Sequence, residues 1–250
     1  MKKLVVVLAM FLSLVSFSQE TEKLFSEGNT FYKTEDYSRA VDVYLSIEEQ
    51  GFESADLYFN IGNCYYKMNK VAPSIYYYEK ALKLDPNYSD AQFNLAFAQR
   101  MSIDAIEQLP KTFLQRFQEN VILKFTYETW AIIAVSASFL MAILFLMYYF
   151  SGGTKTKLAF FNTAILAFFV LLITVFFAYQ NYGVTKKDRP AIIFAEATEI
   201  KNAPTPSGEE VFELHEGTKV QILDELDDWK KIKLTDGKIG WIPSKDLKEI

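Results

Sequence analysis

Cysteine and histidine are nearly absent from this chain, since its 250 residues include one of each. A disulfide needs two thiols, so Cys64 cannot form one within the chain. We interpret Cys64 as a packed core residue and not as a redox thiol. His215 has no second histidine or cysteine with which to share a metal ion, and we expect it in a turn at the end of a strand. The sequence predicts no metal site.

Catalytic motifs and a basic surface are missing as well. We find no nucleophile paired with a base, no cluster of metal ligands and no phosphate-binding loop. The formal net charge is −5 at pH 7, so the phosphates of a nucleic acid would be repelled. We therefore expect a protein that is not an enzyme, needs no cofactor and binds no nucleic acid.

Charge is absent from three apolar segments, and the first of them follows Lys2 and Lys3. It runs for fifteen residues, from Leu4 to Ser18, and ends in a small-x-small pattern. This order is typical of a secretory signal peptide, here residues 1–18. The segment is short for a membrane-spanning helix, and an uncleaved anchor is the alternative.

The other two apolar segments are longer. Trp130 to Phe150 covers twenty-one residues and Leu158 to Tyr179 covers twenty-two, none of them charged. Each can cross a hydrocarbon core of roughly 30 Å at about 1.5 Å per residue. The connector of seven residues, 151–157, predicts an antiparallel transmembrane hairpin. Because no ionisable side chain lies inside it, we expect an anchor and not an ion pathway.

The charges beside these spans give conflicting indications of topology. An exported N-terminus and two crossings place both ends of the chain in the periplasm. Lys155 and Lys157 agree with a cytoplasmic turn, whereas Lys186, Lys187 and Arg189 favour the opposite orientation. Following the export signal, we expect a two-pass protein of the bacterial inner membrane with periplasmic N- and C-terminal domains.

A repeat with a period of about 34 residues is the most informative feature that the sequence does contain. A period of this length indicates a helix–turn–helix unit that must stack on its neighbours to bury its apolar face. Stacked helix pairs present a concave surface to other polypeptides. The recurring positions are Phe25 and Phe59, Gly28 and Gly62, and Asn29 and Asn63.

The second copy resembles the tetratricopeptide repeat, which implies an all-α solenoid. We expect repeats at 21–54 and 55–88, followed by a capping helix at 89–107. Two repeats are fewer than such solenoids usually need, so other packing must supply burial. The resemblance rests on Ile61, Gly62, Tyr65, Tyr78, Ala81 and Pro86.

The same resemblance implies a set of residues that face the groove. Three phenylalanines would form a ladder, and two asparagines would grip a peptide backbone. Because phenylalanine occupies the place of the basic residues of a carboxylate clamp, we expect an extended apolar or aromatic ligand. Packing between repeats is the alternative role of these aromatic residues. The set is Phe25, Asn29, Tyr32, Lys33, Phe59, Asn63, Tyr66, Lys67 and Phe93.

The segment 108–129 joins the repeats to the first span. Phe113, Phe117 and Val121 are four residues apart, which places them on one face of an amphipathic helix. Such a helix either lies in the membrane interface or extends the cap of the solenoid. The spacing alone leaves both interpretations open.

Residues 190–250 alternate in hydrophobicity and predict a small all-β barrel of five short strands. The dipeptide Asp236-Gly237 indicates a tight hairpin. The segments Leu214–Val220, Asp227–Trp229 and Gly240–Leu247 resemble the bacterial SH3 domain, although the tyrosine-rich motif of polyproline binders is absent. Trp229, Trp241 and Pro243 are candidate surface residues, with capping of the barrel core as their alternative role.

The order of signal peptide, repeats, hairpin and SH3-like barrel resembles the BatE-type proteins of the bacterial aerotolerance (Bat) operon. That resemblance implies a scaffold that binds protein partners, other membrane-anchored Bat-type proteins among them, within an envelope complex of the Bat and MoxR type. It also implies a link to stress or oxygen tolerance. The alternative function is an envelope receptor whose SH3-like module binds cell-wall peptide.

Overall fold

The computed structural model describes residues 20–104, 106 and 109–250, so the predicted signal peptide lies outside the described residues. The chain divides into two compact units. The helical repeats and the β-domain together form the first unit. Residues 85–87 and 109–189 form the second.

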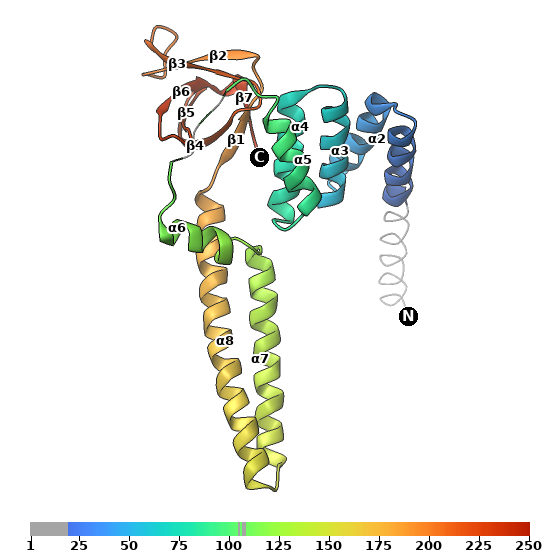
Figure 1. Cartoon of the computed structure of the whole chain (residues 1–250), viewed down its shortest axis with the longest axis vertical. Coiled ribbons are helices and arrows are strands. Elements are labelled where there is room, and N and C mark those ends of the chain that lie inside the picture. The colour runs from blue at the N-terminus through green and yellow to red at the C-terminus, as the bar shows by residue number, and fades with distance from the viewer. Residues whose placement is uncertain (1–19, 105, 107–108) are drawn as a thin grey trace, which may run out of the picture. The chain divides into compact units, whose positions relative to one another are not determined.

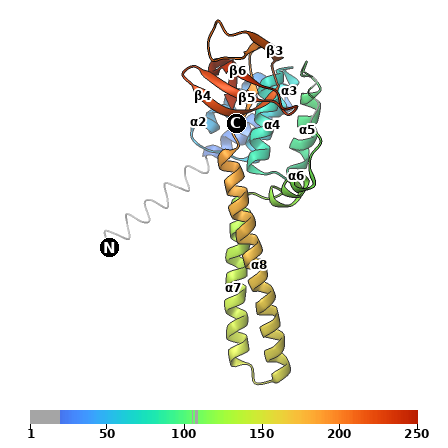
Figure 2. The ribbon, with the colours of Figure 1, turned by 90° about the vertical axis from the view of Figure 1, so that its left-hand side faces the viewer.

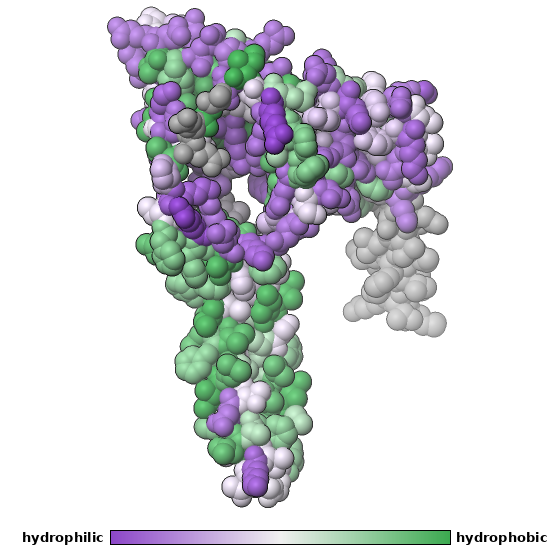
Figure 3. All heavy atoms as spheres, viewed as in Figure 1, coloured by the Kyte–Doolittle hydropathy of each residue, from purple (hydrophilic) through white to green (hydrophobic). Residues whose placement is uncertain are grey.

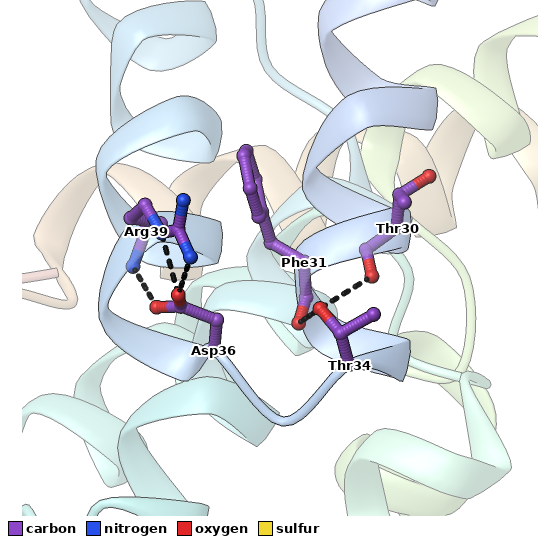
Figure 4. Close-up of polar contacts among 5 residues, drawn as sticks. All are labelled: Thr30, Phe31, Thr34, Asp36 and Arg39. Atoms are coloured by element: carbon purple, nitrogen blue, oxygen red, sulfur yellow. Dashed lines mark hydrogen bonds and ion pairs between the residues drawn. The ribbon is translucent and has the colours of Figure 1, made fainter.

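Helix pairs with short turns build the α-part of the first unit (Figure 1). The polar residue before two of these helices caps them: Ser54 accepts a hydrogen bond from the Leu57 amide, and Asp36 accepts one from the Arg39 amide. Figure 4 shows this first turn, where Asp36 also pairs with the Arg39 guanidinium. The helices are residues 20–33, α2 (Tyr37–Glu49), α3 (Ala55–Lys67), α4 (Val71–Leu84) and α5 (Ser89–Gln99).

Two glycines set how closely the helices of each pair approach. A Cβ atom on Gly28 would lie 2.4 Å from the Tyr44 ring, and one on Gly62 would lie 2.7 Å from the Tyr78 ring. Because both tyrosines are fully buried, only glycine leaves room for them. Helix α5 ends at Gln99 and is shorter than the predicted cap of 89–107.

The β-domain is an antiparallel sheet of seven strands in the order β3-β2-β6-β5-β4-β1-β7. The prediction of five strands was wrong, because it missed β2 and β7. Strand β2 carries Thr198 and Glu199 between apolar residues, and β7 has only three residues, so neither shows a clear apolar run. The strands are β1 (Pro190–Ile193), β2 (Ala197–Lys201), β3 (Glu210–His215), β4 (Lys219–Leu226), β5 (Trp229–Lys233), β6 (Ile239–Pro243) and β7 (Leu247–Glu249).

The predicted Asp236-Gly237 hairpin joins β5 to β6. The Leu234 amide donates to the Lys238 carbonyl at 2.9 Å, and Gly237 has a φ of 94°, a conformation that favours glycine. The Asp236 carboxylate accepts a hydrogen bond from the Lys238 amide. The turn therefore aligns β5 with β6, which places Trp229 opposite Pro243.

Two long apolar helices dominate the second unit, α7 (Tyr127–Phe150) and α8 (Thr154–Lys187). They lie antiparallel, side by side, in Figures 1 and 2. Their surface is mostly hydrophobic in Figure 3, and both are long and apolar enough to cross a membrane. The turn between them is shorter than predicted, and α8 continues past Tyr179 to Lys187.

The segment before α7 is not the single amphipathic helix that the spacing predicted. It forms the short helix α6 (Phe113–Phe117) and then a π-helical turn, η1 (Gln118–Ile122). In a π-helical turn the backbone bonds five residues apart, so the four-residue spacing does not continue to Val121. This segment belongs to the unit of α7 and α8 and does not extend the solenoid.

Candidate protein-binding face

The two predicted asparagines form the same hydrogen bonds in each repeat. The Asn29 Oδ1 atom accepts from the Tyr44 hydroxyl at 2.7 Å and from the Asn60 amide at 3.2 Å. The equivalent bonds, one repeat further on, join the Asn63 Oδ1 atom to Tyr78 and to Asn94, both at 2.8 Å. An amide oxygen has two lone pairs, so the oxygen of each asparagine is fully used within the solenoid.

This hydrogen-bond network decides which groups of the two asparagines can still bind a ligand. Burial raises the pKa of Tyr44 and of Tyr78, which keeps both hydroxyls protonated as donors. Asn29 and Asn63 have only their amide N–H groups left for a ligand, and these donate to a peptide carbonyl. The structure thus gives both residues a structural role that the repeat pattern did not indicate.

The three predicted phenylalanines differ in exposure. Phe25 packs on the Tyr44 ring with centroids 5.8 Å apart, and Phe59 lies 5.0 Å from the Tyr88 ring, so both are half-buried. Phe93, on α5, is 65% exposed and contacts Phe97 edge to face at 4.8 Å. Packing within the repeats accounts for the first two, and Phe93 with Phe97 forms an exposed aromatic pair.

Opposite charges lie at the two ends of this face. Lys33 and Lys67 are exposed at the C-terminal ends of their helices, and exposed Arg100 follows α5. We call these three residues the basic edge. The N-terminal ends carry exposed Glu22, Asp56 and Asp90, each one repeat from the next, which we call the acidic edge. Eleven helical residues separate Glu22 from Lys33, or roughly 16 Å.

The remaining predicted residues lie between these edges. Tyr32 is half-buried and contacts the Tyr37 ring at 5.4 Å, and Tyr66 is also half-buried. The sequence reasoning did not single out Asp90, Phe97 or Arg100. The repeat period could have found Asp90, which is equivalent to Glu22 and Asp56, whereas Phe97 falls on the position of Asn63 and Arg100 on that of Tyr66.

Within the first unit, the β-domain supplies burial that the two repeats lack. Ile192 of β1 is fully buried in the core of the repeats, and the Phe194 ring contacts Tyr76 of α4 at 5.7 Å. Gly217 lies against Val71 and Ile75, since a Cβ atom there would be 2.9 Å from each. The two modules therefore share one apolar core.

Polar contacts surround this shared core. Lys219 of β4 pairs with Glu79 of α4 at 2.7 Å, and the Lys83 ammonium donates to the backbone carbonyl of Ile250 at 2.7 Å. Each contact joins residues more than 130 positions apart in the sequence. No local pattern in the sequence indicates either of them.

Asp104, in the segment after α5, forms several polar contacts with the β-domain. Its carboxylate accepts from the His215 backbone amide at 2.7 Å and the Thr218 hydroxyl at 2.6 Å, and lies 2.9 Å from the His215 Nδ1 atom. The hydrogen bond to Asp104 raises the pKa of His215. The hydrogen bonds from Thr218 and His215 hold the pKa of Asp104 below its usual value despite partial burial.

Two further predictions about single residues are confirmed. His215 is the last residue of β3, at a strand end as predicted. Cys64 is fully buried, and burial raises the pKa of its thiol to about 12, so it is not a reactive thiolate. In the described part of the chain no cluster of metal ligands is present.

The three candidate residues of the β-domain lie on neighbouring strands. Trp229 pairs with Pro243, and Trp241 pairs with Lys231, whose ammonium is 5.8 Å from the indole ring. Directly opposite residues share one face of a sheet. All three candidates are partly exposed, whereas Ile232 and Ile242 are fully buried on the other face. The structure thus brings these residues together at the surface of the β-domain.

Comparisons with known proteins identify the two kinds of module. Residues 55–88 match a family model described as tetratricopeptide repeat, and residues 77–110 match another of the same description. Residues 196–248 match the model of the bacterial SH3 domain. Both families are typically non-catalytic interaction modules, and no enzyme family was found.

Comparisons with whole proteins are less informative. No curated protein matches the chain. Among solved structures, the crystal structure of MamA protein matches with 16% identity and a TM-score of 0.32, over 70% of this chain and 79% of that one. A likeness this low supports no argument. The predicted fold class is confirmed: the chain has a tetratricopeptide-like helical region, two long apolar helices and an antiparallel β-domain matching the bacterial SH3 domain.

Proposed function

We propose that this chain is a membrane-anchored scaffold that holds protein partners on the periplasmic side of the bacterial inner membrane. Its partners are other membrane-anchored proteins of an envelope complex of the Bat and MoxR type, linked to stress or oxygen tolerance. The order of the modules supports this proposal, because it resembles the BatE-type architecture. Both recognised modules belong to families that bind proteins.

The exposed aromatic pair of Phe93 and Phe97 is the observation that carries the binding proposal. Phe93 is in register with Phe25 and Phe59, and Phe97 is in register with Asn29 and Asn63, so the pair lies between the acidic edge and the basic edge. Exposed aromatic side chains on a rigid framework are the usual anchors of protein interfaces. The face fits an extended segment with apolar anchors and with charged residues of opposite sign at its two sides.

Substitution of the exposed aromatic tests this binding face. Phe93→Ala removes contact area without opening the core, so partners crosslinked in intact cells should be recovered at a tenfold lower level or less. Leu226→Ala is the matched control, because Leu226 is exposed on β4 of the same unit. Equal recovery from both variants would show that partners bind elsewhere.

The proposed topology follows from the export signal and the two apolar helices. We propose a cleaved signal peptide at 1–18, repeats at 21–107 and spans at 130–150 and 158–179. The C-terminal domain, 190–250, then returns to the periplasm. Protease added outside spheroplasts should digest the repeats and the β-domain and spare α7 and α8. Protection of both soluble modules would reverse the orientation.

The second candidate function is binding of cell-wall peptide by the β-domain. The adjacent positions of Trp229, Trp241 and Pro243 beside Lys231 favour it, since aromatic rings and a cation can contact a peptide and its carboxylate. The full chain in detergent should then sediment with purified peptidoglycan, and Trp241→Ala should reduce the bound fraction. Val211→Ala, an exposed residue of β3, is the control.

A further inference from the structure

The short helix α6 exposes apolar side chains that nothing in its own unit covers. Phe113 is 80% exposed and Leu114 is 75% exposed, and no residue of the helix is buried. Thr112 caps the helix and Gln115 completes a capping box, so its conformation is fixed locally. Large, adjacent exposed apolar groups of this kind mark an interaction surface.

The segment that carries α6 is fastened to the hairpin. Asn181 of α8 is only 3% exposed, and its amide donates to the Ile122 carbonyl at 2.9 Å and to the Phe125 carbonyl at 2.7 Å. The Trp130 indole also donates to the Ile122 carbonyl, at 2.8 Å. These donors satisfy backbone carbonyls at the end of η1, so the segment cannot swing freely. Figures 1 and 2 both draw α6 near the end of the hairpin that is away from the turn.

The uncharged length of α8 gives the depth at which α6 would lie in a membrane. The uncharged stretch begins at Leu158 after Lys157, and Phe177 is nineteen residues further on. At about 1.5 Å per residue this is roughly 29 Å, which matches the hydrocarbon core of a bilayer. The Phe117 ring of α6 contacts Phe177 at 6.4 Å, and Trp130 contacts it at 5.1 Å. With a hydrocarbon core that begins at Leu158, as the proposed anchoring requires, both rings lie where that core ends.

Charge around α6 agrees with this depth. Residues 109–125 contain three basic residues and one acidic residue, Glu119, which pairs with Lys111 at 2.6 Å. Arg116 of α6 is exposed, and Lys186 and Lys187 end α8 roughly 14 Å beyond Phe177 along the helix. An exposed basic side chain beside an apolar surface complements anionic lipid headgroups.

We propose that Lys111–Phe125 is an interfacial elbow that lies in the plane of the membrane surface. Phe113 and Leu114 insert at the boundary between headgroups and acyl chains, and Arg116 contacts the phosphates of anionic lipids. This inference rests on the proposed membrane anchoring of α7 and α8. The elbow fixes the depth of the hairpin, because the rigid connection through Asn181 transmits the position of α6 to α8.

Depth measurements on the full chain test the elbow. Spin labels are attached to single cysteines in the variants Phe113→Cys, Glu119→Cys and Val135→Cys, each in a Cys64→Ala background. The protein is then reconstituted in vesicles of phosphatidylcholine and phosphatidylglycerol. We expect the label at 135, within α7, to be deep, the label at 113 to be at the acyl boundary, and the label at 119 to be accessible to an aqueous relaxation agent. Circular dichroism confirms that each variant is folded.

The outcomes separate this inference from the anchoring on which it rests. Equal aqueous access at 113 and 119, with 135 deep, would overturn the elbow and leave the anchor; the apolar residues of α6 would then be a surface for a protein partner. Aqueous access at 135 as well would overturn both. A label at 113 that moves outward when phosphatidylglycerol is omitted supports the contact of Arg116 with anionic headgroups.

Discussion

At the scale of single residues, the repeats depend on positions where size or hydrogen-bonding capacity is fixed by a neighbour. Gly28 and Gly62 leave room for buried tyrosine rings, and Asn29 and Asn63 use both lone pairs of their side-chain oxygens. The same contacts occur once in each repeat, so each substitution has an equivalent in the other copy. Each prediction about one repeat can therefore be tested at the equivalent residue of the other repeat.

Substitution of Gly62 should destabilise the repeats through overpacking. A Cβ atom in Gly62→Ala would lie 2.7 Å from the Tyr78 ring, which must move within a packed core. We expect a loss of about 1–3 kcal/mol in the free energy of unfolding. Gly183→Ala is the control, because nothing lies within 4 Å of its Cβ position in α8. Urea titration in detergent measures both, and equal stability would contradict the close approach.

Removal of the Asn63 side chain should leave the Tyr78 hydroxyl without its acceptor. A polar group buried without a partner costs roughly 1–3 kcal/mol, so Asn63→Ala should lower stability by that amount. In a Tyr78→Phe background, Asn63→Ala should lower stability by less, since no hydroxyl remains without an acceptor. A double-mutant cycle measures this coupling. Additive losses would show that the hydrogen bond contributes nothing.

At the scale of elements, the loop between β3 and β4 is fastened to the segment that follows α5. Asp104 accepts three hydrogen bonds there, and His215 is the one partner that changes charge near neutral pH. Glu213 also raises the pKa of His215. The bond between the His215 ring and Asp104 therefore depends on pH, whereas the apolar contacts of Ile192 and Phe194 do not.

The sign of the pH dependence follows from the two pKa directions. The folded pKa of His215 is raised, so its contribution is complete below its usual pKa of about 6.5 and is lost as pH rises through the raised value. The pKa of Asp104 is lowered, so its contribution is lost only in acid, as pH falls through that lowered value. We expect more amide exchange in residues 215–218 at pH 8.5 than at pH 6, after correction for intrinsic exchange.

A variant distinguishes this pair from general pH effects. His215→Gln keeps a polar side chain that cannot gain a proton in this range, so the difference in exchange between pH 6 and pH 8.5 should disappear. An unchanged difference in the variant would assign the effect to other groups. Lys219 and Glu79 form a second ion pair between the β-domain and the repeats. This pair is present in the wild type and in the variant.

At the scale of the whole molecule, the repeats and the β-domain should unfold as one cooperative body. Ile192 belongs to the β-domain by sequence and to the repeat core by packing. The contacts of Tyr76 with Phe194, and of Lys219 with Glu79, extend the same junction. The hairpin and the elbow form the other unit, in which Asn181 and Trp130 hold η1 in place.

Truncation of Ile192 tests this cooperativity. Ile192→Ala opens a cavity in a shared core and should cost about 2–4 kcal/mol. Tyrosine signals from the repeats and tryptophan signals from Trp229 and Trp241 should shift to lower urea by the same amount. Leu226→Ala, exposed on β4, should change neither. Separate transitions would show that the two modules fold independently.

Much of the local structure, the helix pairs, the two long apolar helices and one hairpin, could be predicted from the sequence alone. Periods are local properties, so the repeat predicted the helix pairs, the charge-free runs predicted α7 and α8, and Asp236-Gly237 predicted the hairpin. Short elements without a clear apolar pattern, β2 and β7, escaped prediction for the same reason.

Which distant residues meet became visible only in the folded chain. Asp104 and His215 are 111 positions apart, and Ile192 enters a core built by residues more than ninety positions earlier. No period links such pairs, because their contact depends on how two already folded surfaces complement each other. For the same reason the folded structure, and not any sequence pattern, assigned the oxygens of Asn29 and Asn63 to the framework and fastened α6 to the hairpin.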